Sequence, residues 1–564
     1  MINLQSNKHL LDASLGKTKA DLVLKNGSVL NVFSSEIIKA DVAICGNTIV
    51  GVGEYSGKNE IDCTGKYITP GLIDAHMHME SSMLLPGELS KVLVQAGTTI
   101  IIADPHEAVN VSGTKALDYL LKATEKTLCD IYIMVPSSVP ASDNDVNGCG
   151  EFTAGMMKKY VHNPRVLGLG ETMRYSDVIN AEERMEEKIN LFKNNNMKID
   201  GHFPGGSGKE LQAYRLSGVQ DDHESTTKEE ALEKLRSGIA VFIREGSGAK
   251  NVEAVVKGLL EEKVSLTNCM FCTDDKHTAE IKREGHISTC VAKAIALGVP
   301  AVQAYRMATI QTAQFYGLRN CGAVAAGYKA DILILNNIGD VHPEKIIKNG
   351  MLLTSEDFSK NYDMQVPKKL FHTVYFSNLT KEKIAVKLEE KNKVIEMLPG
   401  QLLTNLLYEK VNGAEGFFTP DSTYNKICVV ERHNRTHTAA ACPVKGFGIC
   451  KSAVATSVSH DAHNIIACGD NDDDILNAVE CIKEMQGGYA ISSGGKIIGK
   501  LPLKLFGLMS LDSSEQVEKT LSKMLEEAQT LGVKKGIDPF INLSFMALTV
   551  IPKARITDKG IVVM

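Results

Sequence analysis

The chain has 564 residues, 43% of them hydrophobic and 23% charged, and its formal net charge is −6. This length predicts two or three domains, and the composition is typical of a globular protein. The negative charge disfavours nucleic acid and anionic membranes as partners, and no apolar run predicts a membrane span or a signal peptide. The 13 cysteines then predict reduced thiols in a cytoplasm.

Short β-like runs dominate the first part of the chain. Residues 20–67 alternate apolar and polar side chains around Asn-Gly and Gly-Asn turns, and a similar texture returns at residues 321–337. Alternation around such turns is typical of hairpins in a small sheet. We therefore predict a small composite β-sandwich domain that joins residues 1–67 to residues 319–354.

The middle of the chain alternates strand-like runs with helical stretches, which predicts βα units and a parallel sheet. Eight strands are expected, at residues 73–78, 98–104, 130–137, 166–171, 198–202, 219–223, 240–245 and 265–274. Eight such units in about 250 residues have the size of a closed (β/α)8 barrel, here residues 68–318. Residues 355–564 mix short strands and helices and predict a C-terminal α+β domain, so the fold class is α/β.

The first of these strands carries two histidines in the run GLIDAHMHMESSM, residues 71–83. Alternate side chains of a strand lie on one face, so His76 and His78 are expected to share a face with Asp74 and Glu80. Alone, this pattern leaves open both a metal site and a strand end with solvated polar side chains.

Polar side chains recur at the carboxyl ends of the other strands, where a barrel carries its active site. Histidine or carboxylate ends seven of the eight strands, at His76 and His78, Asp104 to Glu107, Glu171, His202, Asp222 to Glu224, Arg244 and Glu245, and Asp274 and Asp275. Solvated loops rarely produce such a pattern. Four imidazoles with two carboxylates are the ligand types that a pair of divalent metal ions needs.

The order of these residues resembles the amidohydrolase superfamily. Longer motifs are similar to the bacterial and archaeal adenine deaminases and span nearly the whole chain: PGLIDAHMHMESSM, ADPHEAVNVSG, VPSSVPA, GLGETM, DGHFPGGSGKELQAY, DDHESTTKEEALEKLRSGIAVFIREGS, FCTDDKH, ERHNRT and SHDAHNI. One departure lies in NRTH, residues 434–437, where the resemblance leads us to expect glycine at position 437.

The resemblance implies a centre of two divalent metal ions, with manganese or iron preferred and zinc also suitable. Its ligands would be His76, His78, Glu171, His202, His223 and Asp274. Glu171 would bridge the ions, and a metal-bound hydroxide would attack C6 of adenine while Asp274 passes its proton to the leaving amine, giving hypoxanthine and ammonia. Candidates for substrate contacts or support of the ligands are Asp275, Glu80, His106, Arg244 and Glu245. A homo-oligomer is the commoner assembly.

Two other functions stay open. Cyclic-amide hydrolases of the dihydroorotase type more often place a carboxylated lysine where this chain has Glu171, and a non-catalytic scaffold would not need the complete ligand set. GGSGKE (residues 205–210) lacks the spacing of a phosphate-binding loop, and the His-x-Glu of HME lacks the Pro-Cys-x-x-Cys of other zinc deaminases. His460 and His463 would share a face on a helix, where they would bind a further metal, form a hydrogen-bonded pair or reach over the barrel mouth.

Overall fold

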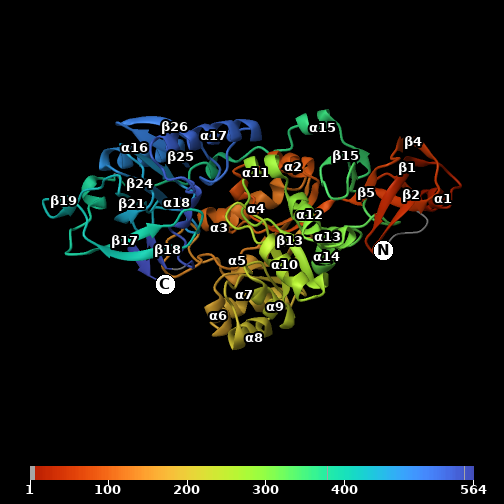
Figure 1. Cartoon of the computed structure of the whole chain (residues 1–564), viewed down its shortest axis with the longest axis horizontal. Coiled ribbons are helices and arrows are strands. Elements are labelled where there is room, and N and C mark those ends of the chain that lie inside the picture. The colour runs from red at the N-terminus through yellow and green to blue at the C-terminus, as the bar shows by residue number, and fades with distance from the viewer. Residues whose placement is uncertain (1–6, 378, 552, 564) are drawn as a thin grey trace.

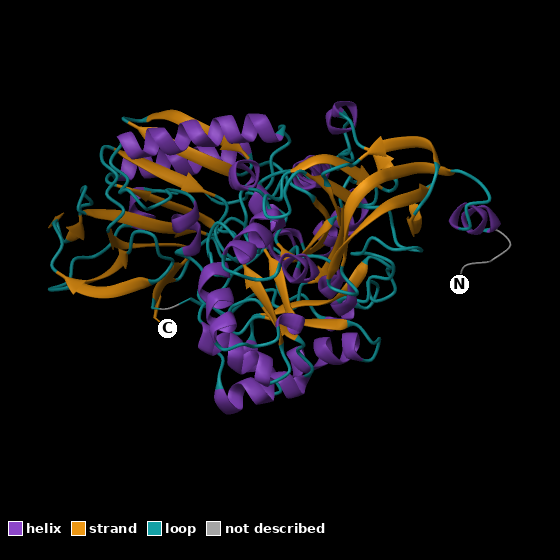
Figure 2. Ribbon diagram, turned by 45° about the vertical axis from the view of Figure 1, so that its right-hand side comes forward, coloured by secondary structure: helices purple, strands orange, loops and turns teal. Residues whose placement is uncertain are grey.

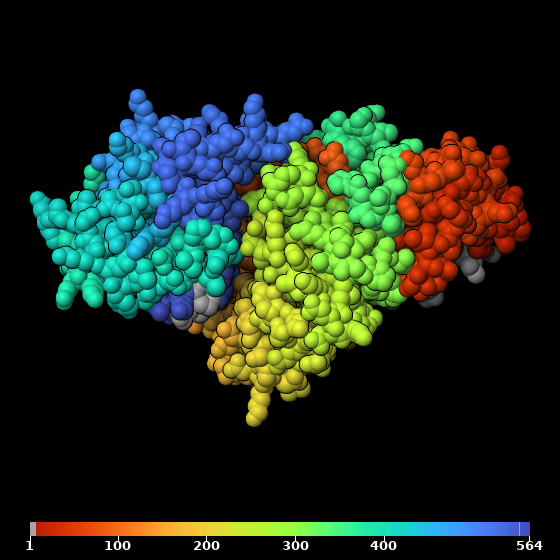
Figure 3. Space-filling model, in the orientation of Figure 1, coloured from red at the N-terminus to blue at the C-terminus, as the bar shows by residue number. Residues whose placement is uncertain are grey.

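The computed structural model describes residues 7–377, 379–551 and 553–563. Three regions follow one another along the long axis of the molecule (Figure 1): an N-terminal sheet, a middle region of parallel strands with helices, and a C-terminal region. The space-filling view places the middle of the chain, in yellow and green, between the two ends (Figure 3). None of the helices in the described part of the chain combines the length and apolar content that a membrane crossing needs.

The N-terminal sheet joins two distant segments of the chain. Its strands are β1 (Ala20–Asn31), β2 (Glu36–Cys45), β3 (Thr48–Gly53), β4 (Gly57–Asp62), β5 (Tyr67–Pro70), β14 (Ile332–Leu335), β15 (Pro343–Lys348) and β16 (Met351–Leu352). The order is β16-β15-β14-β5-β1-β2-β3, with β4 paired to β1. Because β5 pairs with both β1 and β14, hydrogen bonds join strands of the two segments in one sheet, as a composite domain requires.

The eight strands predicted for the middle region are present, in order and parallel. They are β6 (Leu72–Met77), β7 (Thr98–Ala103), β8 (Asp130–Val135), β9 (Val166–Thr172), β10 (Lys198–Gly201), β11 (Asp221–Asp222), β12 (Ala240–Arg244) and β13 (Cys269–Cys272). They form a sheet of five, β10-β9-β8-β7-β6, and a sheet of three, β11-β12-β13. Backbone bonds also join the two sheets: Gln220 donates to Ile199 over 3.0 Å, and His78 donates to Asp274 over 3.2 Å. The parallel strands thus form a curled sheet inside the helices (Figure 2).

Alternation along the strands explains why both faces of this curled sheet are apolar. On β7, Ile100 and Ile102 join one buried cluster with Ile73 and Phe242 of neighbouring strands. Ile101, between them, joins the large cluster that includes the helices. Parallel strands covered on both faces read as continuous apolar runs, which is why the sequence revealed them.

Helices follow the strands and pack around them. The helices of this region are α2 (Pro86–Gln95), α3 (His106–Ser112), α4 (Thr114–Ala123), α5 (Ala154–Met157), α6 (Tyr175–Ile179), α7 (Glu183–Lys193), α8 (Gly208–Ser217), α9 (Lys228–Arg236), α10 (Val252–Glu261), α11 (Thr278–Glu284), α12 (Ile287–Ala296), α13 (Ala301–Met307) and α14 (Ile310–Phe315). A 3-10 turn, Glu80–Ser82, follows β6, and another, Leu266–Asn268, occupies the start of the predicted eighth strand.

The C-terminal region is built on a second eight-stranded sheet. Its strands are β17 (Asn392–Met397), β18 (Thr404–Glu409), β21 (Tyr424–Val430), β22 (Ala439–Lys445), β23 (Ser452–Thr456), β24 (Ile465–Gly469), β25 (Gly488–Ser493) and β26 (Lys496–Pro502), with α16 (Asp472–Met485), α17 (Ser514–Thr530) and α18 (Ile541–Phe545) beside them. Ser510 donates to Met83 over 2.7 Å, which ties this region to the loop after β6. The mixture of strands and helices agrees with the α+β prediction.

The loop that follows β21 contains His437, at the position where the resemblance leads us to expect glycine. His437 has a φ of 56°, a left-handed conformation that glycine adopts at lowest cost. The backbone amides of Arg435, Thr436 and His437 all donate to Oε2 of Glu431, over 3.0–3.1 Å. The loop is therefore organised around one carboxylate oxygen, and His437 adopts a left-handed conformation that glycine would also adopt.

Candidate metal centre

His76 and His78 lie at the carboxyl end of β6 and face each other. Their Nε2 atoms are 3.2 Å apart. Nδ1 of His78 donates to the carbonyl of Asp104 over 2.8 Å, and this bond leaves the Nε2 lone pair free to bind a cation. Asp74 and Glu80 do not continue this face, because β6 ends at Met77 and Asp74 instead accepts hydrogen bonds from Thr273.

Glu171, near the end of β9, occupies the middle of the centre. Its Oε1 lies 3.3 Å from Nε2 of His78 and 3.2 Å from Nδ1 of His106. Its Oε2 lies 2.6 Å from Nδ1 of His202 and 3.4 Å from Nε2 of His223. Each oxygen of this one buried carboxylate therefore faces a different pair of imidazoles.

Asp274 approaches the same histidines from the other side. Its Oδ1 is 3.0 Å from Nε2 of His78 and 3.7 Å from Nε2 of His76. Its Oδ2 accepts a hydrogen bond of 2.8 Å from Arg244, which also binds Glu224 through both terminal nitrogens. Arg244 thus holds the Asp274 carboxylate in one orientation.

Asp274 and Asp275 lie beyond the regular part of their strand. Neighbouring side chains of a strand point to opposite faces, but β13 ends at Cys272 and Asp274 has a φ of 59°, so this alternation does not separate the two aspartates. Both aspartates line the same cavity, and Asp275 accepts a hydrogen bond from Ser81. The two aspartates therefore differ in their hydrogen-bond partners and not in the face to which they point.

The donor set fits divalent cations. Three-residue groups with ligand atoms within 4.8 Å of one another include His76, His78 and Glu171; His76, His223 and Asp274; and Glu171, His202 and His223. Both ring nitrogens of His223 and Nδ1 of His106 are buried without a hydrogen-bond partner among the described residues. Buried imidazoles without hydrogen-bond partners, next to ionised carboxylates, are typical of residues that bind a metal ion.

Glu171, Asp274 and His76 have the charge states of metal ligands, whereas at His78 and His202 the neighbouring carboxylates outweigh burial and raise both pKa values. Burial raises the pKa of Glu171, but the charge of His202 and the close approach of His106 and His223 outweigh it and hold that pKa well below its usual value. Arg244 likewise outweighs burial and lowers the pKa of Asp274. Burial lowers the pKa of His76 to about 4, so this imidazole is neutral at pH 7, the form that binds metal.

A cavity of about 310 Å³ opens onto this centre. The middle region supplies its polar wall, with His78, His106, Glu171, His202, Glu224, Arg244, Asp274 and Asp275. The C-terminal region supplies the opposite wall, with Leu402, Leu403, His460, Asp461, Phe545, Leu548, Val550 and Ile551. The cavity therefore belongs to neither region alone, and its apolar side is suited to a flat ring.

The candidate substrate contacts divide into two groups. His106, Arg244 and Asp275 line the cavity. Glu245 lies outside the described lining, and its buried carboxylate pairs with Lys293 at 2.5 Å. Glu80 is also outside that lining, and its Oε1 accepts the backbone amide of Ala108 over 3.0 Å. Glu245 is therefore paired within the protein, whereas Oε2 of Glu80 has no hydrogen-bond partner among the described residues and Glu80 lines an adjoining hollow with Asp275 and His460.

The sequence prediction missed Glu224, Glu107 and Asp461 as site residues. Glu224 follows His223 directly, and its pairing with Arg244 would have been suggested by opposite charges at the ends of neighbouring strands. Glu107 follows His106 at the start of α3. Asp461 gave no comparable signal, because it lies in a turn between β23 and β24 far along the chain.

His460 and His463 lie in that turn and not on a helix, so the shared helix face was wrong. His460 stacks on Phe545 with ring centroids 4.5 Å apart and lines the cavity. His463 accepts the backbone amide of Ser459 at Nδ1 over 3.3 Å, and its Nε2 lies 3.6 Å from Glu107. A neutral imidazole that accepts at Nδ1 carries its proton on Nε2, so this proton points toward the Glu107 carboxylate without forming a hydrogen bond at this distance. The turn does reach over the strand ends.

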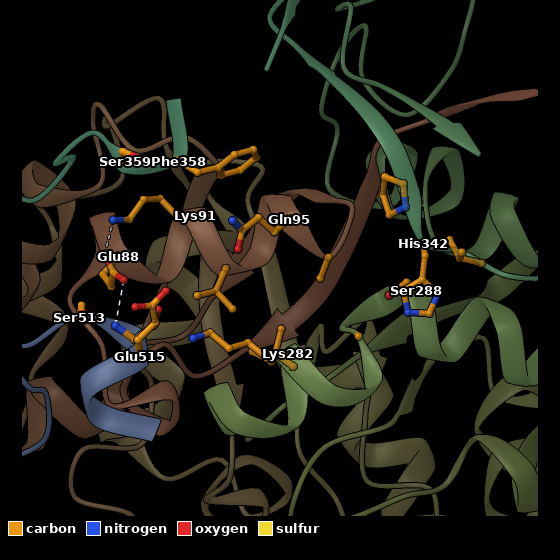
Figure 4. A pocket seen from close by; sticks show the side chains of 17 residues that line it. Glu88, Lys91, Gln95, Lys282, Ser288, His342, Phe358, Ser359, Ser513 and Glu515 are labelled. Atoms are coloured by element: carbon orange, nitrogen blue, oxygen red, sulfur yellow. Dashed lines mark hydrogen bonds and ion pairs between the residues drawn. The ribbon is translucent and has the colours of Figure 1, made fainter. Parts of the chain in front are cut away.

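A second hollow, of about 460 Å³, lies between α2, α11 and the start of α17 (Figure 4). Its charged side chains have partners inside the protein: Glu88 pairs with Lys91 and accepts the Ser514 amide over 2.9 Å, and Lys282 lies 3.1 Å from Glu518. It lacks the clustered imidazoles of the metal centre, so we place the site in the other cavity.

Known proteins share both the middle and the C-terminal region of this chain. The profile of the amidohydrolase family matches residues 67–361, and that of the adenine deaminase C-terminal domain matches residues 401–564. An adenine deaminase of Desulfitobacterium hafniense is 46% identical over 99% of this chain and 98% of its own length. One of Clostridium acetobutylicum is 41% identical over 98% and 97%. A crystal structure of an adenine deaminase is 18% identical, with a TM-score of 0.46 over 60% of this chain and all of its own.

The fold and the histidine–carboxylate centre are therefore those of an amidohydrolase. The relatives named adenine deaminase match nearly the whole chain, so this chain belongs to the adenine deaminase family. The relatives' name also favours deamination over the cyclic-amide hydrolysis that the sequence had left open.

Proposed function

We propose that this chain is an adenine deaminase, which converts adenine and water to hypoxanthine and ammonia. The position of Glu171 carries the proposal, because each of its oxygens faces a different pair of imidazoles. The name shared by relatives 41% and 46% identical to this chain supplies the substrate.

The residues present fit two divalent metal ions, held by His76, His78, Glu171, His202, His223 and Asp274. When bound, such ions lower the pKa of a water molecule and so supply a nucleophile near neutral pH. We infer manganese or iron, with zinc also suitable, because imidazole and carboxylate ligands accept all three. Glu171 would then join the two positions through its two oxygens.

Asp274 is the group that moves protons in this proposal. It is ionised, and Arg244 fixes its Oδ2 while Oδ1 faces the histidines. It accepts the proton of the attacking water as the new C6–O bond forms, and it returns the proton to the amine as the C6–N bond breaks. His106 and Asp275 lie along the cavity wall, where they contact the purine.

The predicted architecture forms part of this proposal. Backbone bonds between the five-stranded and three-stranded sheets, at Gln220 and at His78, support a closed (β/α)8 barrel over residues 68–318. The composite domain would then comprise residues 1–67 with 319–354, and the C-terminal domain residues 355–564. A homo-oligomer in the cytoplasm is proposed on general grounds of composition and assembly.

A direct assay tests the proposal. The purified protein is stripped with a chelator, one metal is restored at a time, and adenine loss is measured together with ammonia release. We expect equal amounts of adenine lost and ammonia formed with manganese or iron. Absence of turnover with manganese, iron and zinc would overturn the assignment of the substrate, and a protein that purifies without metal and without activity would indicate the non-catalytic scaffold.

A further inference from the structure

Glu224 lies in the wall of the catalytic cavity, next to two of the proposed metal ligands. It follows His223 directly in the chain, lines the cavity, and has a side chain that is 12% exposed. Its Oε1 lies 3.4 Å from Nε2 of His223 and 3.8 Å from Nδ1 of His202. This oxygen therefore faces the same two imidazoles as Oε2 of Glu171.

The separations around His223 are those of ligands that share one cation. Its Nε2 is buried and has no hydrogen-bond partner among the described residues, although Glu171 and Glu224 each place an oxygen 3.4 Å from it. Two ligand atoms that lie about 2.0–2.2 Å from one ion, at the tetrahedral angle, are about 3.4 Å apart. Both oxygens are therefore placed to bind the ion that His223 binds.

The pairing with Arg244 leaves Glu224 able to bind a cation. Nη1 of Arg244 donates to Oε1 of Glu224, and Nη2 donates to Oε2 over 3.2 Å. An ionised carboxylate has about four lone-pair sites, so Oε1 can accept from Arg244 and still face the imidazoles. Nη1 also donates to Oδ2 of Asp274 over 2.8 Å, while Oδ1 of Asp274 faces His78. Arg244 thus orients one carboxylate on each side of the centre.

Counting Glu224 makes the two halves of the centre alike. Each half then contains two imidazoles, one oxygen of Glu171 and one further carboxylate: His76, His78 and Asp274 in one half, and His202, His223 and Glu224 in the other. Two nitrogen and two oxygen atoms complete a four-coordinate site. The half with His202 and His223 therefore reaches this number through Glu224.

We propose that Glu224 is a further metal ligand, which binds the ion held by His202 and His223 as Asp274 binds the other ion. This inference rests on the proposed two-metal centre for adenine deamination. The Glu224 carboxylate offsets charge between two cations that repel each other. Its loss should therefore weaken one ion selectively.

The test measures the affinity for each ion in the full-length protein. Wild type and Glu224→Gln are chelated, titrated stepwise with manganese, and analysed for bound metal after equilibrium dialysis. The amide keeps the length of the side chain and an oxygen for Arg244 but removes the charge. Groups that only support metal ligands contribute about 10- to 100-fold to metal affinity, so for a ligand we expect at least that loss at one position, with the other ion retained.

Arg244→Gln distinguishes binding of the ion by Glu224 from mere orientation of Arg244. The guanidinium repels a nearby cation, so its removal should leave an ion bound directly by Glu224 held at least as tightly. If Arg244→Gln loses the ion next to Asp274, binding by Glu224 predicts that the double variant loses both ions. If Glu224 acts only through Arg244, both single variants lose the same ion and the double variant loses no more than either, which would overturn the inference.

Glu245→Gln is the matched control. Glu245 directly follows Arg244, the last residue of β12, but it pairs with Lys293 outside the described cavity lining, so this variant should retain both ions. Melting temperatures of the metal-free variants identify misfolding. If Glu224→Gln melts early, Glu224→Asp takes its place, because it keeps the charge but shortens the reach, and the same ion should be lost.

Retention of both ions at wild-type affinity by the Glu224 variant would also overturn the inference. A wild-type protein that binds fewer than two ions, or that does not deaminate adenine when loaded, would instead mark failure of the proposed function. The two failures are therefore distinguishable.

Discussion

The two walls of the catalytic cavity are built in different ways. The polar wall comes from the ends of parallel strands, which bring His78, Glu171 and Asp274 together within a few ångströms. The opposite wall comes from the turn between β23 and β24, from the end of α18 and from loop residues of the C-terminal region. The first wall holds charge for chemistry, and the second presents Phe545 and aliphatic side chains to the ring. We therefore expect substitutions in the polar wall to change the rate of the reaction, and substitutions in the opposite wall to change substrate binding.

Glu171→Gln should have the largest effect. A neutral amide keeps the volume but removes the charge that joins the two proposed metal positions. Substitution of groups that only support metal ligands costs about 10- to 100-fold in metal affinity, and for a ligand we expect at least that loss at one position, with a comparable or greater fall in kcat. Metal content after equilibrium dialysis measures it.

Glu245→Gln is the control for that variant. Glu245 also ends a strand of the curled sheet, but it pairs with Lys293 outside the described cavity lining. Metal content should stay at the wild-type level. If both variants lose metal equally, the special position of Glu171 is wrong.

Asp274→Asn should have the next largest effect. The amide keeps the size of the side chain but cannot accept the proton of the attacking water, and general acid–base catalysis contributes about 10²- to 10⁴-fold. Turnover should fall by that factor with metal content checked. Asp275→Asn, measured alongside, should raise KM more than it lowers kcat. The reverse pattern would exchange the roles of the two aspartates.

Phe545→Leu should have the smallest effect, because it changes only the apolar wall. Phe545 lines the cavity, and loss of an aromatic contact with the base, worth about 0.5–1.5 kcal/mol, predicts a rise in KM of roughly 2- to 10-fold with kcat nearly unchanged. Phe540→Leu, which removes a stacked contact with Tyr489 outside the described cavity lining, is the control. A large fall in kcat for Phe545→Leu alone would show that the two walls are not independent.

The same difference explains what the sequence could predict. The strands of the middle region are buried on both faces, so their apolar runs reveal both the strands and the polar residues at their ends. Asp461 and Phe545 depend on how the C-terminal region packs across those ends, which no local pattern encodes. Asp274 was assigned to a strand that ends two residues earlier, because a left-handed turn leaves no periodic signal. The metal ligands themselves stay a prediction until metal is measured.

The most direct test of the account is a titration of the chelated protein with manganese or iron, following adenine deamination against equivalents of metal per chain. The account predicts that activity rises to a plateau at about two equivalents, and that Glu171→Gln does not reach this plateau under the same conditions. A plateau at one equivalent in the wild-type protein, or full activity of Glu171→Gln at two, would contradict a centre in which Glu171 joins two metal ions.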